Sequence, residues 1–539
     1  MKLSKPNKDK TKLDMKFDRN ESLSHLKNEV VWDVVVIGGG ATGLGVAVDS
    51  ASRGYKTILL ESHDFAKGTS SRSTKLVHGG VRYMANGDIS LVKEALRERG
   101  LLAKNATHLF KNQSFVIPNY NFWGGVYYKI GLSIYDLLAG KLSLGRTKYL
   151  SKSTIQKYIP TINPHKLANG VLYQDGQFDD ARLAINLAQT AVEQGAVVLN
   201  YCSVIGFEKD KEGKVIGVEA KEKETGVVYK LKSKAIVNAT GVFTNEIMQM
   251  DNPDSKKTII PSQGIHLVLD QSFLPSNKAL MIPKTSDGRV LFAVPWHGKV
   301  IIGTTDTLIK ECSYEPYPLE REIDFILETA QRFLVGKPTR KDVKAVFSGL
   351  RPLAAPSDQT KSTKEISRSH KIIVSKSGIV SMIGGKWTTY RKMAEEIVDK
   401  LIALGKLDLS VCRTEEISIH GNSGKTPVDF SNPYYVYGSD MDTLERLRKE
   451  NPEYQEKIHP EYAYRLDMVA FAVKYEMAIQ IEDVLARRLR LLFLDAKAAQ
   501  ESAPKVAICM ANLLGKGQNW IDDQLESFKE LSNKYLLKC

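Results

Sequence analysis

The sequence predicts an α/β protein in which a Rossmann-like unit is combined with antiparallel β structure and a helical C-terminal domain. Three observations predict this fold. A strand–glycine turn–helix–strand pattern occupies residues 34–60, and an alternation typical of antiparallel strands occupies 260–305. From about residue 405 the glycines become rare, and residues 460–500 have a mostly helical pattern.

The composition is that of a globular protein. The 539 residues are 42% hydrophobic and 26% charged, and at roughly 100–200 residues per domain they correspond to several domains. We expect no membrane span, because no run reaches the roughly 20 apolar residues that a span needs. Residues 1–30 are basic and lack the apolar core of a secretory signal, so we expect a flexible lead-in.

The charge and the cysteines narrow the function classes. The net charge of +14 suits nucleic acid, an anionic membrane surface or an anionic substrate, and its sign alone does not choose among them. The five cysteines include no C-x-x-C pair. We therefore predict neither a disulfide framework nor a zinc site, no metal centre, and a reducing compartment.

The first α/β unit carries a dinucleotide-binding pattern. Gly38, Gly40 and Gly43 stand between a buried strand and a helix, and Glu61 ends the second strand. Glycines at these positions permit a tight turn, the approach of a pyrophosphate to the backbone, and close packing of helix on strand. The helix N-terminus favours phosphate, and the carboxylate of Glu61 is placed to bind ribose hydroxyls.

Further elements follow along the chain. The helical patterns span 91–107, 179–195 and 390–401, and the strand patterns span 197–205, 215–220, 227–231, 235–241 and 379–383. Residues 119–144 are aromatic and irregular, typical of core or membrane-contact packing. The arginines at 487–490 are expected on a solvated or interdomain helix face.

Three segments favour FAD over NAD. The first is a run of hydroxyls and backbone amides soon after the first unit, suited to a second pyrophosphate wall and a ribityl chain; its candidates are Thr69, Ser70, Ser71, Thr74 and Lys75. The second is the strand end at Thr240 and Gly241, and the third is the turn at Gly384 and Gly385. That last turn aims another helix N-terminus at the flavin ring, where it would stabilise negative charge on the reduced ring.

Four motifs resemble those of the FAD-dependent glycerol-3-phosphate dehydrogenases. They are IGGGATGLGVAVDSASRG at 37–54, SSRSTKLVHGGVRY at 70–83, SGLRPL at 348–353 and GGKWTTYRKMA at 384–394. The resemblance covers about residues 30–500. It departs at Leu44, where the family more often has a small residue, in a position that affects helix packing rather than chemistry.

The resemblance implies a D-amino-acid-oxidase-like fold. The FAD domain would comprise 31–105, 170–260 and 345–404, the substrate domain 106–169 and 261–344, and the helical domain 405–539. The implied reaction converts sn-glycerol 3-phosphate into dihydroxyacetone phosphate, with electrons passing through FAD to a membrane quinone. We expect a cytoplasmic protein associated peripherally with the anionic inner face of the cell membrane, and no nucleic-acid partner. The oligomeric state stays open, a homodimer included.

The chemistry of a secondary alcohol with a phosphate requires a base and cations. His78 and His266 are rival candidates for the base that takes the hydroxyl proton. The candidate phosphate ligands are Arg82, Arg351 and Arg368, of which Arg368 stands in a polar run that is equally typical of surface. Lys386 is a candidate ligand of substrate or reduced flavin, and Tyr83 a hydrogen-bond donor.

Three alternatives remain at this point. An oxidase that passes electrons to oxygen would use the same site and would release peroxide. An FAD-containing RNA-binding or RNA-modifying protein would account for the positive charge and would bind RNA in a salt-sensitive way. A peripheral membrane protein without turnover is the third.

Overall fold

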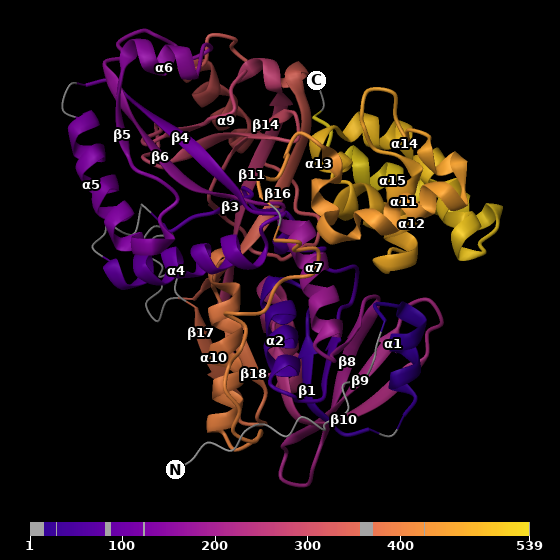
Figure 1. The fold of residues 1–539 in the computed structure, drawn as a ribbon. Helices are drawn as coiled ribbons and strands as arrows, with labels where there is room; N and C mark the ends of the chain where they lie inside the picture. The colour runs from indigo at the N-terminus through magenta and orange to yellow at the C-terminus, as the bar shows by residue number, and fades with distance from the viewer. Residues whose placement is uncertain are drawn as a thin grey trace.

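The structure is a computed structural model of the chain, and it describes residues 16–28, 30–80, 88–121, 124–355, 370–424 and 426–537. Two β-sheets and a group of C-terminal helices make up the molecule (Figure 1). The predicted fold class is confirmed: a Rossmann-like domain, an antiparallel domain and a helical C-terminal domain are all present.

The first sheet has the strand order β17-β18-β10-β1-β2-β7, and all of its neighbours except β17 and β18 pair in parallel. Its strands are β1 (Trp32–Ile37), β2 (Thr57–Leu60), β7 (Val197–Leu199), β10 (Val228–Asn238), β17 (Lys371–Val374) and β18 (Val380–Ile383). Helices α2 (Ala41–Ser52), α7 (Asp180–Glu193) and α10 (Tyr390–Ala403) cover one face. Val34 and Val36 pack on that face, and Val35 and Ile37 on the other. An apolar strand buried on both sides is what a parallel sheet between two layers requires.

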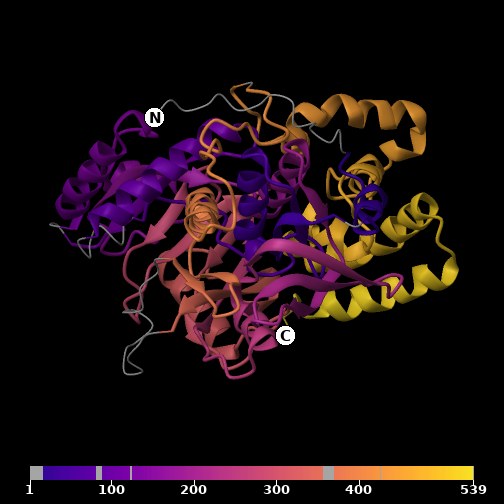
Figure 2. The same ribbon diagram turned by 90° about the horizontal axis from the view of Figure 1, so that it is seen from below.

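An antiparallel meander covers the second face of this sheet. It consists of β8 (Cys202–Lys209), β9 (Val215–Glu222) and the first half of β10, with α8 (Thr244–Asp251) beside it. Figure 2 shows these strands running alongside the N-terminal helix.

The expected flexible lead-in is wrong for part of its length. Residues Arg19–Leu26 form helix α1, which begins where the Asp18 side chain accepts a hydrogen bond from the Glu21 N–H. Arg19 forms a buried ion pair with Glu222 at 2.5 Å, and Leu26 packs with Trp32. The helix is polar along most of its surface, so the sequence pattern alone did not indicate that tertiary contacts stabilise it.

The second sheet is mostly antiparallel. Its strands are β3 (Leu76–Val77), β4 (Lys111–Asn119), β5 (Lys148–Ser151), β6 (Asn169–Gln177), β11 (Ile259–Asp270), β12 (Ala279–Ile282), β13 (Leu291–Trp296), β14 (Lys299–Gly303), β15 (Thr307–Leu308) and β16 (Val343–Ala354). The helices around it are α4 (Ile89–Asn105), α5 (Gly124–Ala139), α6 (Lys152–Tyr158) and α9 (Glu320–Phe333).

Two strands belong to a different sheet from the one that the predicted domain boundaries imply. β6 pairs with β4, and β16 pairs with β11, so both lie in the second sheet although most of each was placed in the FAD domain. A short apolar strand carries no local signal of its partner, because the partner is distant in the sequence.

The C-terminal helices pack against β16 of the second sheet and against α7, which covers the first sheet. They are α11 (Met441–Glu450), α12 (Leu466–Tyr475), α13 (Leu491–Leu494), α14 (Ala496–Leu514) and α15 (Gln518–Asn533), with a turn of π-helix, η9 (Asp483–Arg488), before α13. Arg487, Arg488 and Arg490 are buried between the domains, so the interdomain interpretation of this cluster holds and the solvated one is wrong. Across the described ranges, no helix combines the length and apolarity required to cross a bilayer.

Gly43 determines how closely α2 approaches β1. A Cβ at this position would lie 1.9 Å from the carbonyl oxygen of Gly38 and 3.3 Å from Cγ1 of Val36. The expected reason for this glycine, close packing of helix on strand, is therefore confirmed. Backbone atoms cannot move aside as a flexible side chain can.

We expect Gly43→Ala to lower the free energy of unfolding of the apoprotein by about 1–3 kcal/mol or more, because the new methyl group overpacks a backbone contact. Chemical unfolding followed by circular dichroism measures the change. The control is Gly517→Ala, where a Cβ meets no heavy atom within 4 Å and the expected loss is less than about 1 kcal/mol. Equal losses in the two variants would contradict this account.

Candidate active site

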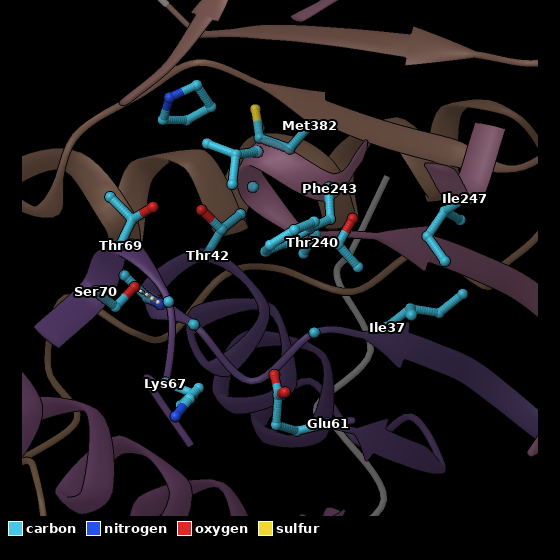
Figure 3. Close-up of a pocket in the computed structure, with 18 of the residues that line it drawn as sticks. Ile37, Thr42, Glu61, Lys67, Thr69, Ser70, Thr240, Phe243, Ile247 and Met382 are labelled. Carbon is cyan, nitrogen blue, oxygen red and sulfur yellow. Dashed lines mark hydrogen bonds between the residues drawn. The ribbon is translucent and has the colours of Figure 1, made fainter. Parts of the chain in front are cut away.

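A cavity lies at the carboxyl ends of the parallel strands (Figure 3). Its volume is about 360 Å³, and its lining extends from Ser203 and Val204 on β8 to Lys386 and Trp387 after β18. Open parallel sheets bind their ligands at this edge, where the strands end and the connecting turns begin. The cavity is therefore the candidate active site.

The glycine turn after β1 forms one wall. Gly40 precedes α2 and no side chain caps the helix, although Ser70 Oγ accepts a hydrogen bond from the Ala41 N–H at 2.9 Å. Gly38 has a φ of +107°, and a Cβ there would lie 2.8 Å from the carbonyl oxygen of Ala239. A helix N-terminus with partial positive charge thus faces a cavity that backbone atoms can border closely, which suits a pyrophosphate.

Glu61 stands at the end of β2 and is 8% exposed. Its Oε2 accepts a hydrogen bond from the Gly39 N–H at 2.6 Å, and its Oε1 accepts one from the His63 N–H at 2.8 Å. Burial raises the pKa of Glu61, while these two N–H groups oppose the shift. The carboxylate is thereby fixed beside the cavity, in the position that binds ribose hydroxyls in dinucleotide sites.

The turn after β18 closes the opposite side. Gly384, Gly385 and Lys386 line the cavity, and the turn of helix η6 (Trp387–Thr389) follows. Trp387 Nε1 donates a hydrogen bond to the carbonyl oxygen of Ser70 at 2.8 Å. This bond joins two of the three segments that the sequence assigned to the cofactor.

Most of the predicted cofactor residues line this one cavity. They are Gly38, Gly40, Glu61, Thr69, Ser70, Thr240, Gly241, Gly384 and Gly385. Gly43 lies behind the turn, Ser71 Oγ donates to the carbonyl oxygen of Gly68 at 3.4 Å, and Thr74 Oγ1 lies 2.9 Å from His266 Nε2.

Lys75 does not line the cavity, contrary to the prediction. Its ammonium group is fully buried and pairs with Asp180 at 2.7 Å. Burial lowers the pKa of Lys75 to about 7, even though Asp180 opposes the shift. Position in a cofactor motif did not reveal that this side chain turns into the protein interior.

The substrate candidates that the structure describes are His78, His266, Arg351 and Lys386; Arg82, Tyr83 and Arg368 lie outside the described residues. Neither histidine is among the described residues that line the cavity. The carbonyl oxygen of His78 accepts a hydrogen bond from Thr388 Oγ1 at 3.4 Å, which places His78 beside η6.

Arg351 lies on β16, immediately before Pro352, which lines the cavity. Its Nη2 donates to Thr304 Oγ1 and to the carbonyl oxygen of Thr305, both at 3.0 Å, and its Nη1 lies 3.5 Å from Asp306 Oδ1. The side chain is 27% exposed, so this cation is held in place without being sealed from solvent.

His266 lies in the middle of β11 and is 2% exposed. Its ring stacks on Phe347 with 4.8 Å between ring centroids. Burial, together with the positive charges of Lys75 and Arg351, holds the pKa of His266 well below 6.5. The imidazole is consequently neutral at pH 7, which is the protonation state that a base requires.

Several cavity residues were missed by the sequence reasoning. Lys67 lines the wall between Glu61 and Thr69, and its place in that run was a usable signal. Tyr314 stacks on Phe243 and makes a tilted ring contact with His63, each with 4.2 Å between ring centroids. Tyr314 comes from a loop of the antiparallel domain, and no local pattern indicates such a contact.

These features fit FAD. The N-terminus of α2, the buried carboxylate and the second glycine turn provide places for pyrophosphate, ribose and a flavin ring within one cavity.

Comparison with known proteins agrees with this assignment. Residues 33–391 match the family model described as FAD dependent oxidoreductase, and residues 380–521 match the C-terminal domain of alpha-glycerophosphate oxidase. The probable mitochondrial glycerol-3-phosphate dehydrogenase of Caenorhabditis elegans is 38% identical over 526 residues, 92% of this chain and 72% of that protein. The mitochondrial enzyme of Rattus norvegicus is 37% identical over 550 residues, 96% of this chain and 75% of that protein.

The chain belongs to the FAD-dependent glycerol-3-phosphate dehydrogenase family. A solved structure of the family, the Bacillus halodurans enzyme complexed with FAD, superposes with a TM-score of 0.78 at 29% identity and covers 96% of this chain and 97% of that one. L-alpha-glycerophosphate oxidase from Mycoplasma pneumoniae shares the fold, with a TM-score of 0.54 at 18% identity over 71% of this chain and 97% of that one. The cofactor of this family member is FAD.

We expect Glu61→Gln to weaken FAD binding by roughly 10- to 150-fold, the range that corresponds to a charge-assisted hydrogen bond of about 1.5–3 kcal/mol. Flavin fluorescence during reconstitution of the apoprotein measures the dissociation constant. Glu246→Gln is the control, because Glu246 also lines the cavity but is exposed. If the two variants bind FAD equally well, Glu61 is not a ribose ligand.

Proposed function

We propose that this protein oxidises sn-glycerol 3-phosphate to dihydroxyacetone phosphate and passes the electrons through FAD to a membrane quinone. The observation that carries the proposal is a neutral imidazole, His266, close to a fixed cation, Arg351, next to a cavity that also presents Lys386. A phosphorylated secondary alcohol needs this combination of a base and cations.

The residues divide this work. FAD, when bound, supplies a hydride acceptor. Arg351 presents a planar guanidinium to the phosphate dianion, while Thr304, Thr305 and Asp306 hold it in position. Lys386 adds positive charge at the glycine turn, where either substrate or reduced flavin would benefit from it.

We assign the base to His266 rather than to His78. Burial, together with the charges of Lys75 and Arg351, lowers the pKa of His266, and Thr74 Oγ1 lies 2.9 Å from its Nε2. His78 is half-buried, and its carbonyl oxygen contacts η6. Arg82, Tyr83 and Arg368 remain predicted substrate ligands.

The electron acceptor separates a dehydrogenase from an oxidase. The relatives at 36–38% identity are named dehydrogenases, whereas the Mycoplasma pneumoniae oxidase shares only the fold. These names support a quinone as the electron acceptor. Release of peroxide in air would instead support oxygen as the acceptor. The RNA-binding alternative accounts neither for the position of Arg351 nor for the turn at 384–386.

Helix α5 supports association with a membrane surface. Its residues Val126, Tyr127, Ile130, Ile134 and Leu137 are 40%, 68%, 59%, 49% and 79% exposed. Residues 124–157 contain six lysines and arginines and one acidic residue, Asp136. Both ribbon views place α5 at the edge of the molecule opposite the C-terminal helices.

An apolar helix face within a basic segment is complementary to an anionic lipid surface, because the apolar side chains enter the interface and the cations bind headgroups. A quinone is lipid-soluble, so this attachment would bring the enzyme to its acceptor. We therefore propose that the protein attaches through α5 to an anionic membrane surface, the inner face of the cell membrane.

We expect sn-glycerol 3-phosphate to bleach the flavin of the holoenzyme under anaerobic conditions, whereas glycerol and D-amino acids do not.

Arg351→Met should weaken binding of glycerol 3-phosphate by roughly 10- to 150-fold, because a charge-assisted contact is lost. The variant should also lose most of the enzyme's preference for glycerol 3-phosphate over glycerol. Arg351→Lys should recover part of it. Stopped-flow absorbance at increasing substrate concentration gives these values.

The control for that experiment is Arg340→Met, since Arg340 pairs with the exposed carboxylates of Glu320 and Asp324 on α9 and does not line the cavity. An unchanged preference for glycerol 3-phosphate in Arg351→Met would make Arg351 structural and leave Arg82 as the leading phosphate ligand. Bleaching by a different substrate class alone would overturn the proposed function itself.

We expect the double variant Ile130→Glu, Leu137→Glu to bind vesicles of phosphatidylglycerol and phosphatidylcholine about 10-fold or more weakly than the wild type, because two carboxylates replace apolar side chains in the interface. Vesicle co-sedimentation measures it, and binding should fall as salt rises. The control, Leu409→Glu with Val411→Glu, changes residues that are 83% and 64% exposed elsewhere. Equal loss in both double variants would exclude α5 as the attachment surface.

A further inference from the structure

A group of eight charged side chains lies between the cavity wall and the C-terminal domain, and we call it the interdomain charge cluster. None of the eight side chains is more than 17% exposed. Four are cations and four are carboxylates: Lys67, Arg72, Arg487 and Arg488, with Asp64, Glu315, Glu482 and Asp483.

Asp64 is the first attachment point. Arg487 Nε and Arg488 Nη1 each lie 2.5 Å from its Oδ2, and Arg488 Nη2 lies 2.9 Å from its Oδ1. Burial disfavours the charge on Asp64, but Arg488 and Arg487 hold its pKa below the ordinary value. Two arginines of η9 therefore hold the chain at Asp64, three residues after Glu61.

Lys67 is the second attachment point. Its Nζ contacts Glu482 of the C-terminal domain and lies 3.0 Å from Glu315 Oε1. Glu315 also pairs with Arg72 at 2.6 Å and accepts a hydrogen bond from Tyr535 at 3.0 Å. Arg490 completes the contact by donating to the carbonyl oxygen of Ser71 at 2.9 Å.

The residues held by these contacts border the cavity. Lys67 lines it, as do Glu61, Ser62 and residues 66–70 around it. Tyr314, which precedes Glu315, lines it as well. By contrast none of residues 476–490, all of which the structure describes, lines the cavity.

Ion pairs that are withdrawn from water are sensitive to the loss of one partner, because the remaining charge stays buried and unpaired. Loss of the contacts with residues 482–490 would remove both arginine partners of Asp64 and would leave Lys67 with Glu315 as its carboxylate partner, so the wall at 61–72 would have to rearrange. Conversely, a ligand that fixes this wall favours the arrangement in which the cluster is complete.

We propose that residues 482–490 are a positioning element for FAD, so that FAD binding and docking of the C-terminal domain stabilise each other through Asp64 and Lys67. The coupling is reciprocal, because each event changes the affinity of the other by the same factor. It depends on FAD as cofactor and not on the identity of the substrate.

The test compares Glu482→Gln with a control of the same kind in the same domain. Asp467→Asn is that control, since Asp467 is buried and pairs with Arg448 at 2.5 Å but contacts no residue of the wall. Titration of the apoproteins with FAD, followed by flavin fluorescence, gives the dissociation constants. We expect Glu482→Gln to raise the FAD dissociation constant by about 5- to 150-fold and Asp467→Asn to leave it within about 3-fold. Equal constants for the two variants would overturn the proposal.

Amide hydrogen exchange of the wild-type protein tests the reverse direction without any variant. Residues 476–490 do not line the cavity, so direct contact with FAD does not protect them. We expect FAD to slow exchange in these residues by about 5-fold or more relative to the apoprotein, while α15 exchanges at the same rate in both. Identical exchange of residues 476–490 with and without FAD would overturn the proposal, whatever the substrate proves to be.

Discussion

The contact between the backbone of α2 and the backbone of β1 is the constraint on which the cavity depends. Gly43 allows the helix to pass within van der Waals distance of the Gly38 carbonyl, and the helix axis then points its N-terminus at the edge of the sheet. Any larger residue would push α2 outward and redirect its free N–H groups. The other parts of the cavity wall lie beside this helix N-terminus: Glu61, Ser70 and the turn at 384–386.

The cofactor site could be predicted from the sequence far better than the substrate site. Glycine spacing, a strand end and an acidic residue are local features, and nine of the predicted cofactor residues line the cavity. Lys75 was misplaced because its partner, Asp180, lies in a different segment. Tyr314, the sheet membership of β6 and β16, and the burial of Arg487 all depend on contacts between residues distant in the sequence. Helix α1 was missed because its stability comes from Glu222 and Trp32 rather than from its own composition.

The positive charge of the chain has more than one use. The net charge of +14 invited a single explanation, but the cations divide into distinct populations. Arg487, Arg488 and Arg490 are buried and neutralised by carboxylates, so they contribute little to the external field. The lysines and arginines of residues 124–157 have one acidic neighbour in sequence and act on the surroundings. Composition counts both groups equally, whereas only the second group contributes substantially to the electric field outside the protein.

The bond from Trp387 to Ser70 has a consequence for the synthesis of the protein. Chains leave the ribosome N-terminus first, at about 5–20 residues per second, so β1, α2 and β2 are exposed some tens of seconds before β18 and its turn. During that interval the edge of the sheet lacks β18 and its turn, and the backbone groups of β10 that later pair with β18 remain unpaired. The first unit must therefore persist as an incomplete intermediate, and the nascent chain becomes able to enclose a dinucleotide only after most of its length has been translated.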